Sequence, residues 1–152
     1  MKKILSFVST NEDKTKKFAE IFAREILKFK TKRAIAVGLE GELGAGKTVF
    51  AKGFARGLGL KEEMKSPTFI LMRVYRSPTS QGGRTSWRIF FHIDAWRDRI
   101  DFREFLKDPR NILLVEWSDK VKKFLPRDYF LFRFRSPTSR GSRTSREITL
   151  WR

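Results

Sequence analysis

Apolar side chains recur at helical spacing near the start of the chain. A helix ending near residue 30 is predicted by residues at three- and four-residue intervals, namely Phe18, Ile21, Phe22, Ile26 and Phe29. Residues 9–12 (Ser-Thr-Asn-Glu) precede this pattern and are typical of a capping box, which marks a helix start. The apolar run at 4–8 is too short for a signal peptide or a membrane span, so we expect it to form the first strand.

Short apolar and β-branched runs in the rest of the chain predict the strands of a sheet. They cover residues 34–39, 69–75, 87–94, 112–117, 129–134 and 147–151. Helical spacing is visible at 48–58, 100–106 and 118–124. A strand, a loop and a helix follow one another between residues 33 and 58, and this order favours an α/β fold.

The loop of that unit, residues 41–48 (GELGAGKT), fits the phosphate-loop pattern G-x-x-x-x-G-K-[ST]. Glycines let the backbone curl so that successive N–H groups point at phosphate oxygens, and the next helix adds its positive dipole end. Lys47 is expected to reach the β- and γ-phosphates and Thr48 to bind Mg²⁺. The alternative is a glycine-rich turn that binds nothing. The expected nucleotide contacts are Gly41, Glu42, Leu43, Gly44, Ala45, Gly46, Lys47, Thr48 and Val49.

Two carboxylates follow apolar strands and are candidates for the rest of a nucleotide site. Asp94 ends the run 87–93, and Glu116 ends the run 112–115. In open α/β sheets, ligands bind at the carboxyl ends of the strands, which favours a role for both in phosphoryl transfer. The structural alternatives are that Asp94 caps a turn and that Glu116 forms a surface ion pair.

Bulky side chains near these carboxylates are expected to have structural roles. His92, the only histidine, shares a strand face with Asp94, and a lone histidine is usually packed or hydrogen-bonded in a core. A metal or proton-transfer role for His92 is the alternative. Trp96 and Trp117 are expected to pack rather than to stack on a base.

Size and charge narrow the class of protein. A length of 152 residues fits one domain, residues 1–152, and the absence of cysteine excludes disulfides and thiolate metal sites. No apolar run is long enough for a membrane span, so we expect a cytoplasmic protein. The net charge of +17 predicts attraction to polyanions such as RNA, unless the cations only solubilise the surface.

The chain contains one internal near-repeat. Residues 76–86 (RSPTSQGGRTS) and 135–145 (RSPTSRGSRTS) differ at two of eleven positions. Both fall between predicted strands, and their Ser, Thr, Pro, Gly and Arg residues cannot build a core, so we expect basic hairpin insertions near 76–86 and 135–146. Solvated tips are favoured over RNA contact, because no aromatic residues alternate with the arginines.

Four motifs taken together resemble the TsaE family. They are the loop 41–48, Ser66-Pro67-Thr68, residues 92–97 (HIDAWR) and residues 115–117 (VEW). This family is the ATPase component of the bacterial machinery that installs threonylcarbamoyladenosine in tRNA, and it works with TsaD and TsaB. The resemblance implies a P-loop NTPase-like, three-layer α/β sandwich in which a mixed parallel and antiparallel sheet is flanked by helices.

The resemblance also implies roles for individual residues. Lys47, Asp94 and Glu116 would be catalytic, with Asp94 as the Walker-B-like carboxylate and Glu116 orienting the attacking water. The implied Mg²⁺ residues are Thr48, Asp94 and Glu116. Ser66, Pro67 and Thr68 would form a mobile loop facing the γ-phosphate, Asn11 and Glu12 would lie near the adenine, and Trp117 would support the catalytic edge.

We therefore expect a Mg²⁺-dependent ATPase that supports turnover of TsaD and TsaB-like partners and meets tRNA directly or through that complex. Two alternatives remain open at this point. A small-molecule kinase uses the same loop for transfer to a hydroxyl group. A basic RNA-binding module, in which the nucleotide acts as a switch, would also explain the surplus of cations.

Overall fold

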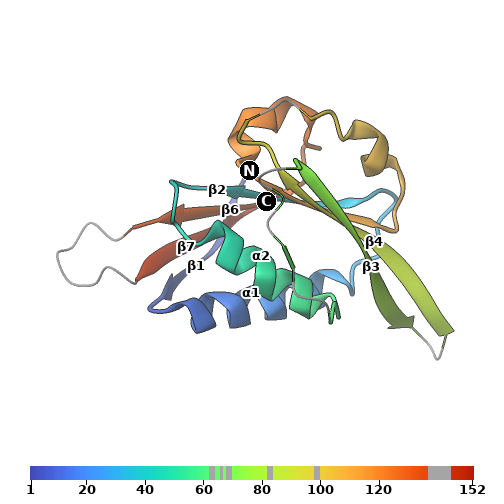
Figure 1. The fold of residues 1–152 in the computed structure, drawn as a ribbon, viewed down its shortest axis with the longest axis horizontal. Helices are drawn as coiled ribbons and strands as arrows, with labels where there is room; N and C mark the ends of the chain where they lie inside the picture. The colour runs from blue at the N-terminus through green and yellow to red at the C-terminus, as the bar shows by residue number, and fades with distance from the viewer. Residues whose placement is uncertain (62–63, 66, 68–69, 82–83, 98–99, 137–144) are drawn as a thin grey trace.

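The strands of the protein form one sheet, shown in Figure 1. The structure is a computed structural model that describes residues 1–152 except 62–63, 66, 68–69, 82–83, 98–99 and 137–144, and except the side chains of 79–81 and 84–86. Its described residues form a seven-stranded sheet in the order β1-β7-β6-β2-β5-β4-β3. The strands are β1 (Lys3–Ser9), β2 (Ile35–Glu40), β3 (Met72–Gln81), β4 (Arg84–Asp94), β5 (Asn111–Glu116), β6 (Phe130–Arg135) and β7 (Arg146–Trp151).

The sheet is mixed, as predicted. Strand β2 pairs in parallel with both β5 and β6, and β4 pairs in parallel with β5. The pairs β1–β7, β6–β7 and β3–β4 are antiparallel. Strands β1, β2, β4, β5 and β6 therefore end at one side of the sheet, which we call the carboxyl edge, and begin at the opposite side, the amino edge.

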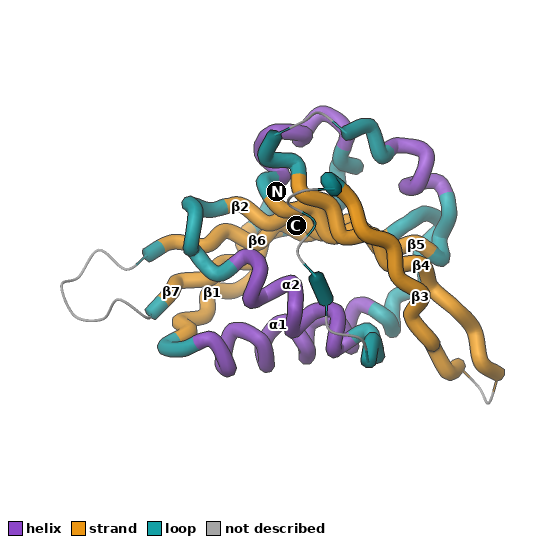
Figure 2. The backbone as a smooth tube through the Cα atoms, viewed as in Figure 1, coloured by secondary structure: helices purple, strands orange, loops and turns teal. Residues whose placement is uncertain are grey.

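Helical segments cover both faces of the sheet (Figure 2). Helices α1 (Glu12–Ile26) and α2 (Lys47–Gly57) cover one face, and the short 3₁₀ helices η1 (Arg103–Lys107) and η2 (Ser118–Phe124) cover the other. This arrangement confirms the predicted three-layer sandwich, although its second helical layer is 3₁₀ rather than α. Within the described part of the chain, no helix has the length and apolar composition that a membrane span requires.

Phenylalanines from both helices and from the sheet fill the larger core. The ring of Phe50 on α2 lies 4.6 Å from that of Phe132 on β6, and Phe22 on α1 lies 4.7 Å from Phe132. Burial of large rings in contact with one another is the main stabilising contribution here. The predicted apolar face is therefore confirmed for Phe18, Phe22 and Ile26, but it is wrong for Ile21, which is 49% exposed.

The two helices approach each other closely through glycine. A Cβ atom added to Gly53 would lie only 2.2 Å from the carbonyl oxygen of Lys16 on α1. Real Cβ atoms do not approach backbone oxygens so closely, so any side chain at this position would push the helices apart. Gly53 thus fixes how closely α2 can lie against α1.

The predicted start and end of α1 were partly wrong. Asn11 is the cap, because its side chain accepts a hydrogen bond from the Lys14 N–H at 2.9 Å, so residues 9–12 are not a capping box. Ser9 instead bonds to the Asn11 carbonyl at 2.7 Å. The helix ends at Ile26 rather than near residue 30, because the next backbone bonds are of the shorter i to i−3 kind, including Phe29 N–H to the Ile26 carbonyl.

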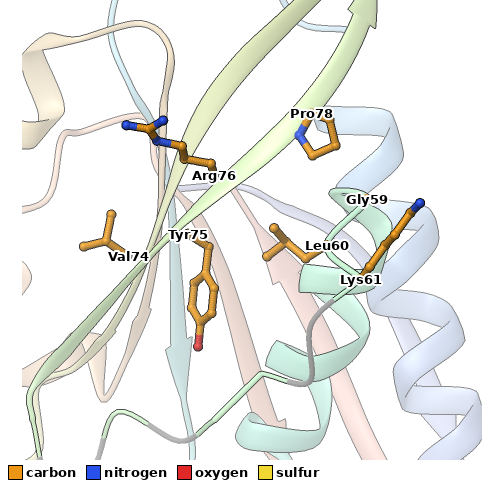
Figure 3. A pocket seen from close by; sticks show the side chains of 7 residues that line it. All are labelled: Gly59, Leu60, Lys61, Val74, Tyr75, Arg76 and Pro78. Carbon is orange, nitrogen blue, oxygen red and sulfur yellow. The ribbon is translucent and has the colours of Figure 1, made fainter.

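The first repeat continues two strands instead of only connecting them. Strands β3 and β4 were predicted at 69–75 and 87–94, but they stay paired in register from Met72 with Ile93 to Gln81 with Arg84. The Ser77 hydroxyl is fully buried and donates to the Leu58 carbonyl at the end of α2. Figure 3 shows Pro78 beside Gly59, and both line a hollow at this point. At the base of this repeat Ser77 is therefore packed, while its neighbours Arg76 and Pro78 are exposed.

The two repeats leave the sheet from opposite edges. The first extends β3 and β4 beyond the amino edge, where β4 begins. The second connects the end of β6 with the start of β7 at the carboxyl edge, and its residues 137–144 lie outside the described residues. Similar sequences are thus attached to opposite ends of the molecule (Figure 1).

Candidate functional site

The glycine-rich loop joins the end of β2 to the start of α2 at the carboxyl edge. Gly41, Gly44 and Gly46 have φ angles of 151°, 75° and 101°, a range that favours glycine. The first hydrogen bond of the helix runs from Phe50 N–H to the Gly46 carbonyl at 2.9 Å. The N–H groups of residues 47–49 therefore have no partner within the helix and point out of its start toward the loop.

The Lys47 side chain lies folded against the loop. Its Nζ donates to the carbonyl oxygens of Gly41 at 2.6 Å and Glu42 at 2.8 Å. The same nitrogen lies 3.5 Å from the ring centroid of Trp117, which is a close cation–π contact. Lys47 is only 5% exposed, so its charge is held between the loop carbonyls and an aromatic face.

Burial lowers the pKa of Lys47 from its ordinary value of 10.5, because the charged form loses hydration. The negative charges of Glu116, Asp119 and Asp94 oppose this effect and raise the pKa. Glu116 contributes most of the three. The structure therefore concentrates carboxylates around the loop lysine, as a site for a metal ion and a phosphate chain requires.

Glu116 joins the loop to the neighbouring strand. Its Oε2 accepts a long hydrogen bond from the Thr48 hydroxyl at 3.4 Å, and its Oε1 lies 2.7 Å from His92 Nε2. Glu116 is 5% exposed and His92 is fully buried, so this is not the surface ion pair that we considered. A carboxylate oxygen can only accept, so His92 donates to Glu116 from Nε2, while Nδ1 has no hydrogen-bond partner among the described residues.

Asp94 lies beside Glu116, because the two residues are register partners on β4 and β5. Its Oδ1 accepts a hydrogen bond from Trp96 N–H at 2.9 Å, so Asp94 does cap a turn. Its charge also acts on Lys47. Within the part of the chain that is described, no cluster of three or more His, Cys, Asp or Glu residues forms a ready metal cage.

The loop and its carboxylates fit a magnesium nucleotide. A Cβ atom added to Gly44 or Gly46 would meet no atom within 4 Å, so the loop backbone is open to an incoming group. Mg²⁺ in nucleotide sites takes one or two protein ligands and completes its shell with phosphate oxygens and water. Thr48 and Glu116 supply such a sparse ligand set, with Asp94 as the next carboxylate.

The other predicted site residues are placed less directly. Asn11 and Glu12 lie at the carboxyl edge, where α1 begins after β1, but Glu12 faces Lys16 at 3.7 Å. Leu43 is 90% exposed on the loop, and Ala45 is buried beneath it. Val49 lies in the first turn of α2. Ser66 and Thr68 lie outside the described residues.

Two contacts at the site were not foreseen from the sequence. Trp117 was expected only to pack, but its ring lies against the Lys47 ammonium group. Its backbone is left-handed, with φ of 59°, and its ring centroid lies 4.3 Å from that of Trp96. Arg146, which follows the second repeat, donates to the Gly44 carbonyl at 3.2 Å. A tryptophan directly after a strand-end glutamate was a usable signal for the first contact, but nothing in the sequence linked Arg146 with Gly44.

Comparisons with known proteins agree on one family. The family model described as "Threonylcarbamoyl adenosine biosynthesis protein TsaE" matches residues 9–147. A Haemophilus influenzae protein named tRNA threonylcarbamoyladenosine biosynthesis protein TsaE is 36% identical over 73% of this chain and 66% of its own length. The Bacillus subtilis protein of the same name is 30% identical over 97% of this chain and 85% of its own length. The crystal structure of Bacillus subtilis YdiB superimposes with a TM-score of 0.71 and 27% identity, covering 99% of this chain and 86% of that one.

Proposed function

The chain belongs to the TsaE family, and on that premise we propose that it is the Mg²⁺-dependent ATPase subunit of the machinery that makes threonylcarbamoyladenosine in tRNA. In this function, ATP bound at the loop 41–48 is hydrolysed at the carboxyl edge of the sheet. Hydrolysis supports turnover of a complex with TsaD and TsaB-like proteins in the cytoplasm. The chain itself does not act on the modified base.

The observation that carries this proposal is the position of Glu116. It lies across from Thr48, with 3.4 Å between Oγ1 and Oε2, at the start of the helix that follows the phosphate loop. A carboxylate here can bind Mg²⁺ through water or accept a proton from an attacking water molecule. A glycine-rich turn without a ligand would not need a buried carboxylate beside its threonine.

Different residues of the chain have different roles in hydrolysis. Magnesium, when bound, neutralises charge on the phosphate oxygens. Lys47 leaves the Gly41 and Glu42 carbonyls and places its ammonium group on the phosphates. Glu116 positions water for in-line attack, and His92 holds the carboxylate in place by donating to Oε1.

The partners follow from the family and not from a contact in the structure. Three relatives that are 30%, 36% and 38% identical are named for tRNA threonylcarbamoyladenosine biosynthesis. We propose that TsaD and TsaB-like proteins are the partners, and that tRNA is met directly or through them. The net charge of +17 suits a protein that works next to tRNA.

A phosphate-release assay tests the function. The full chain is incubated with Mg²⁺ and ATP without an acceptor, alone and together with TsaD and TsaB-like proteins from one organism. The proposal predicts phosphate release that the partners stimulate. Strict dependence on an added hydroxyl acceptor would indicate a kinase instead. Tight tRNA binding without any hydrolysis, even with partners present, would indicate an RNA-binding module.

A further inference from the structure

The amino edge of the sheet carries a second site-like surface, far from the phosphate loop. A hollow with a volume of about 420 Å³ lies by the end of α2 (Figure 3), but a larger one, of about 560 Å³, opens at the amino edge. It lies between the connection from α1 to β2 and the start of β6. We call this surface the basic pole; its charged lining residues are Lys30, Lys32, Arg33, Asp128 and Arg152.

Charge at the basic pole is strongly positive and poorly compensated. The single carboxylate of its lining, Asp128, pairs with Arg33 at 2.5 Å, and this contact lowers the pKa of Asp128. Within the described residues, no ion pair within 4.0 Å involves Lys30, Lys32 or Arg152. Arg152 acts on Asp128 only from beyond ion-pair distance, so these three cations remain available for an anionic partner.

An aromatic surface accompanies these cations. The guanidinium of Arg152 lies 4.7 Å from the ring centroid of Phe130 and 5.7 Å from that of Phe29. Phe29 is 45% exposed although it is a large apolar side chain. A guanidinium over an aromatic ring can still donate its N–H groups to a phosphate, and an exposed ring offers a face on which a base can stack.

Backbone hydrogen bonds hold the segments that carry these cations. Arg152 is held by a pair of backbone hydrogen bonds with Lys2, with N···O distances of 2.6 and 3.0 Å, so both termini lie side by side at this pole (Figure 1). Ala34 N–H donates to the Leu106 carbonyl at 3.0 Å and anchors the connection that carries Lys30 and Lys32. The basic pole is thus attached to the edge of the sheet.

We propose that the basic pole binds an RNA strand, with Lys30, Lys32 and Arg152 on phosphates and Phe29 under a base. Cations combined with an exposed aromatic ring are the combination that single-stranded RNA sites use. A concave surface does not suit a flat membrane. An acidic protein segment would account for the cations, but it contains no base to stack on the exposed ring of Phe29.

The basic pole and the nucleotide loop are separate sites. They lie at opposite ends of β2, whose six residues span roughly 20 Å. Substitutions at the basic pole should therefore leave ATP binding unchanged. This inference goes beyond the proposed ATPase function and can fail while that function holds.

The test measures binding of a fluorescently labelled, unmodified tRNA transcript to the full chain by anisotropy. The pole variant combines Lys30→Gln, Lys32→Gln and Arg152→Gln. A matched control removes the same charge from another basic hollow through Lys52→Gln, Arg56→Gln and Lys61→Gln; that hollow has no aromatic residue in its described lining. Calorimetry with Mg²⁺ and ATP shows whether each variant is folded at the nucleotide site.

The pole variant should bind tRNA at least about tenfold more weakly, and its salt dependence should lose a slope of about 2 to 3 because three phosphate contacts are gone. The control variant should lose less than about threefold. Phe29→Leu, which keeps apolar bulk but removes the ring, should weaken binding about fivefold or more.

Other outcomes contradict the proposal. Equal losses of tRNA affinity in the pole and control variants would mean that binding depends only on the net charge of the protein. Unchanged tRNA binding by the pole variant would exclude the basic pole. If that variant kept tRNA binding but lost binding to TsaD and TsaB-like proteins, or to phosphatidylserine vesicles, the surface would serve a protein or a membrane instead.

Discussion

His92 and Glu116 form one buried pair, with 2.7 Å between Nε2 and Oε1. The only histidine of the chain therefore lies directly behind the carboxylate that we assign to water activation. Glu116 is the hydrogen-bond partner of the His92 ring, because Nδ1 has none among the described residues. We interpret His92 as a positioning residue, since it acts through Glu116.

The histidine pair gives the first prediction. His92→Leu removes the donor and leaves Glu116 free to turn, so kcat for phosphate release should fall about tenfold, in line with the loss of one oriented hydrogen bond. His92→Gln places an amide N–H near the former Nε2 position and should stay within about threefold of the wild type. The dissociation constant for ATP should change little in both. Equal kcat in the two variants would exclude a positioning role.

Lys47 gives a prediction about pH. Its pKa is lowered in the folded protein, so between that value and 10.5 the unfolded chain binds more protons than the folded chain. The free energy of unfolding contributed by Lys47 must therefore rise with pH in this window. Urea denaturation between pH 8 and 10.5, without nucleotide, should show the wild type gaining stability relative to Lys47→Met. A constant or opposite difference would mean that the Lys47 pKa is not lowered.

The close approach of the helices gives a prediction about stability. Gly53→Ala inserts a methyl group 2.2 Å from the Lys16 carbonyl and should lower the free energy of unfolding by about 2 kcal/mol or more. On an unpacked helix, the same change would raise stability by about 1 kcal/mol. Lys52→Ala on the exposed side of α2 is the matched control and should be nearly neutral. Urea titration measures whether Gly53→Ala lowers the free energy of unfolding, as predicted, or raises it, as on an unpacked helix.

The loop lysine also gives a prediction about binding. Lys47→Ala removes the ammonium that would contact the phosphates, so hydrolysis should be lost and the affinity for ATP should fall about tenfold or more. Lys120→Ala, on the neighbouring helix η2, removes an equal charge and should leave both nearly unchanged. Calorimetry with Mg²⁺ and ATP separates binding from hydrolysis. ATP affinity within about twofold of the wild type in Lys47→Ala would contradict the assigned contact.

Local patterns in the sequence predicted much of this fold. The motif 41–48 lies in the expected strand–loop–helix unit, and both predicted carboxylates end adjacent strands, because the apolar runs before Asp94 and Glu116 form parallel neighbours. The contacts that the sequence did not predict depend on packing between distant segments of the chain. The contact of Lys47 with Trp117 and that of Arg146 with Gly44 join segments far apart in sequence, and no spacing rule connects them.

The misplaced boundaries have local causes. Strand β3 was expected to stop before the first repeat, because Ser, Pro and Thr favour turns. Instead, the buried Ser77 hydroxyl bonds to Leu58 and keeps the strand in place. The end of α1 was placed too late, because Phe29 fits the helical spacing although it lies beyond the helix, next to Arg152.

The most direct test of the central claim is phosphate release by Glu116→Gln in the presence of TsaD and TsaB-like proteins. Glutamine keeps the size of the side chain and can still contact Thr48, but it cannot accept a proton from water. We predict that this variant binds Mg²⁺ and ATP within about threefold of the wild type and releases phosphate at least about a hundredfold more slowly. Phosphate release at the wild-type rate would contradict the assignment of Glu116 and the hydrolytic mechanism built on it.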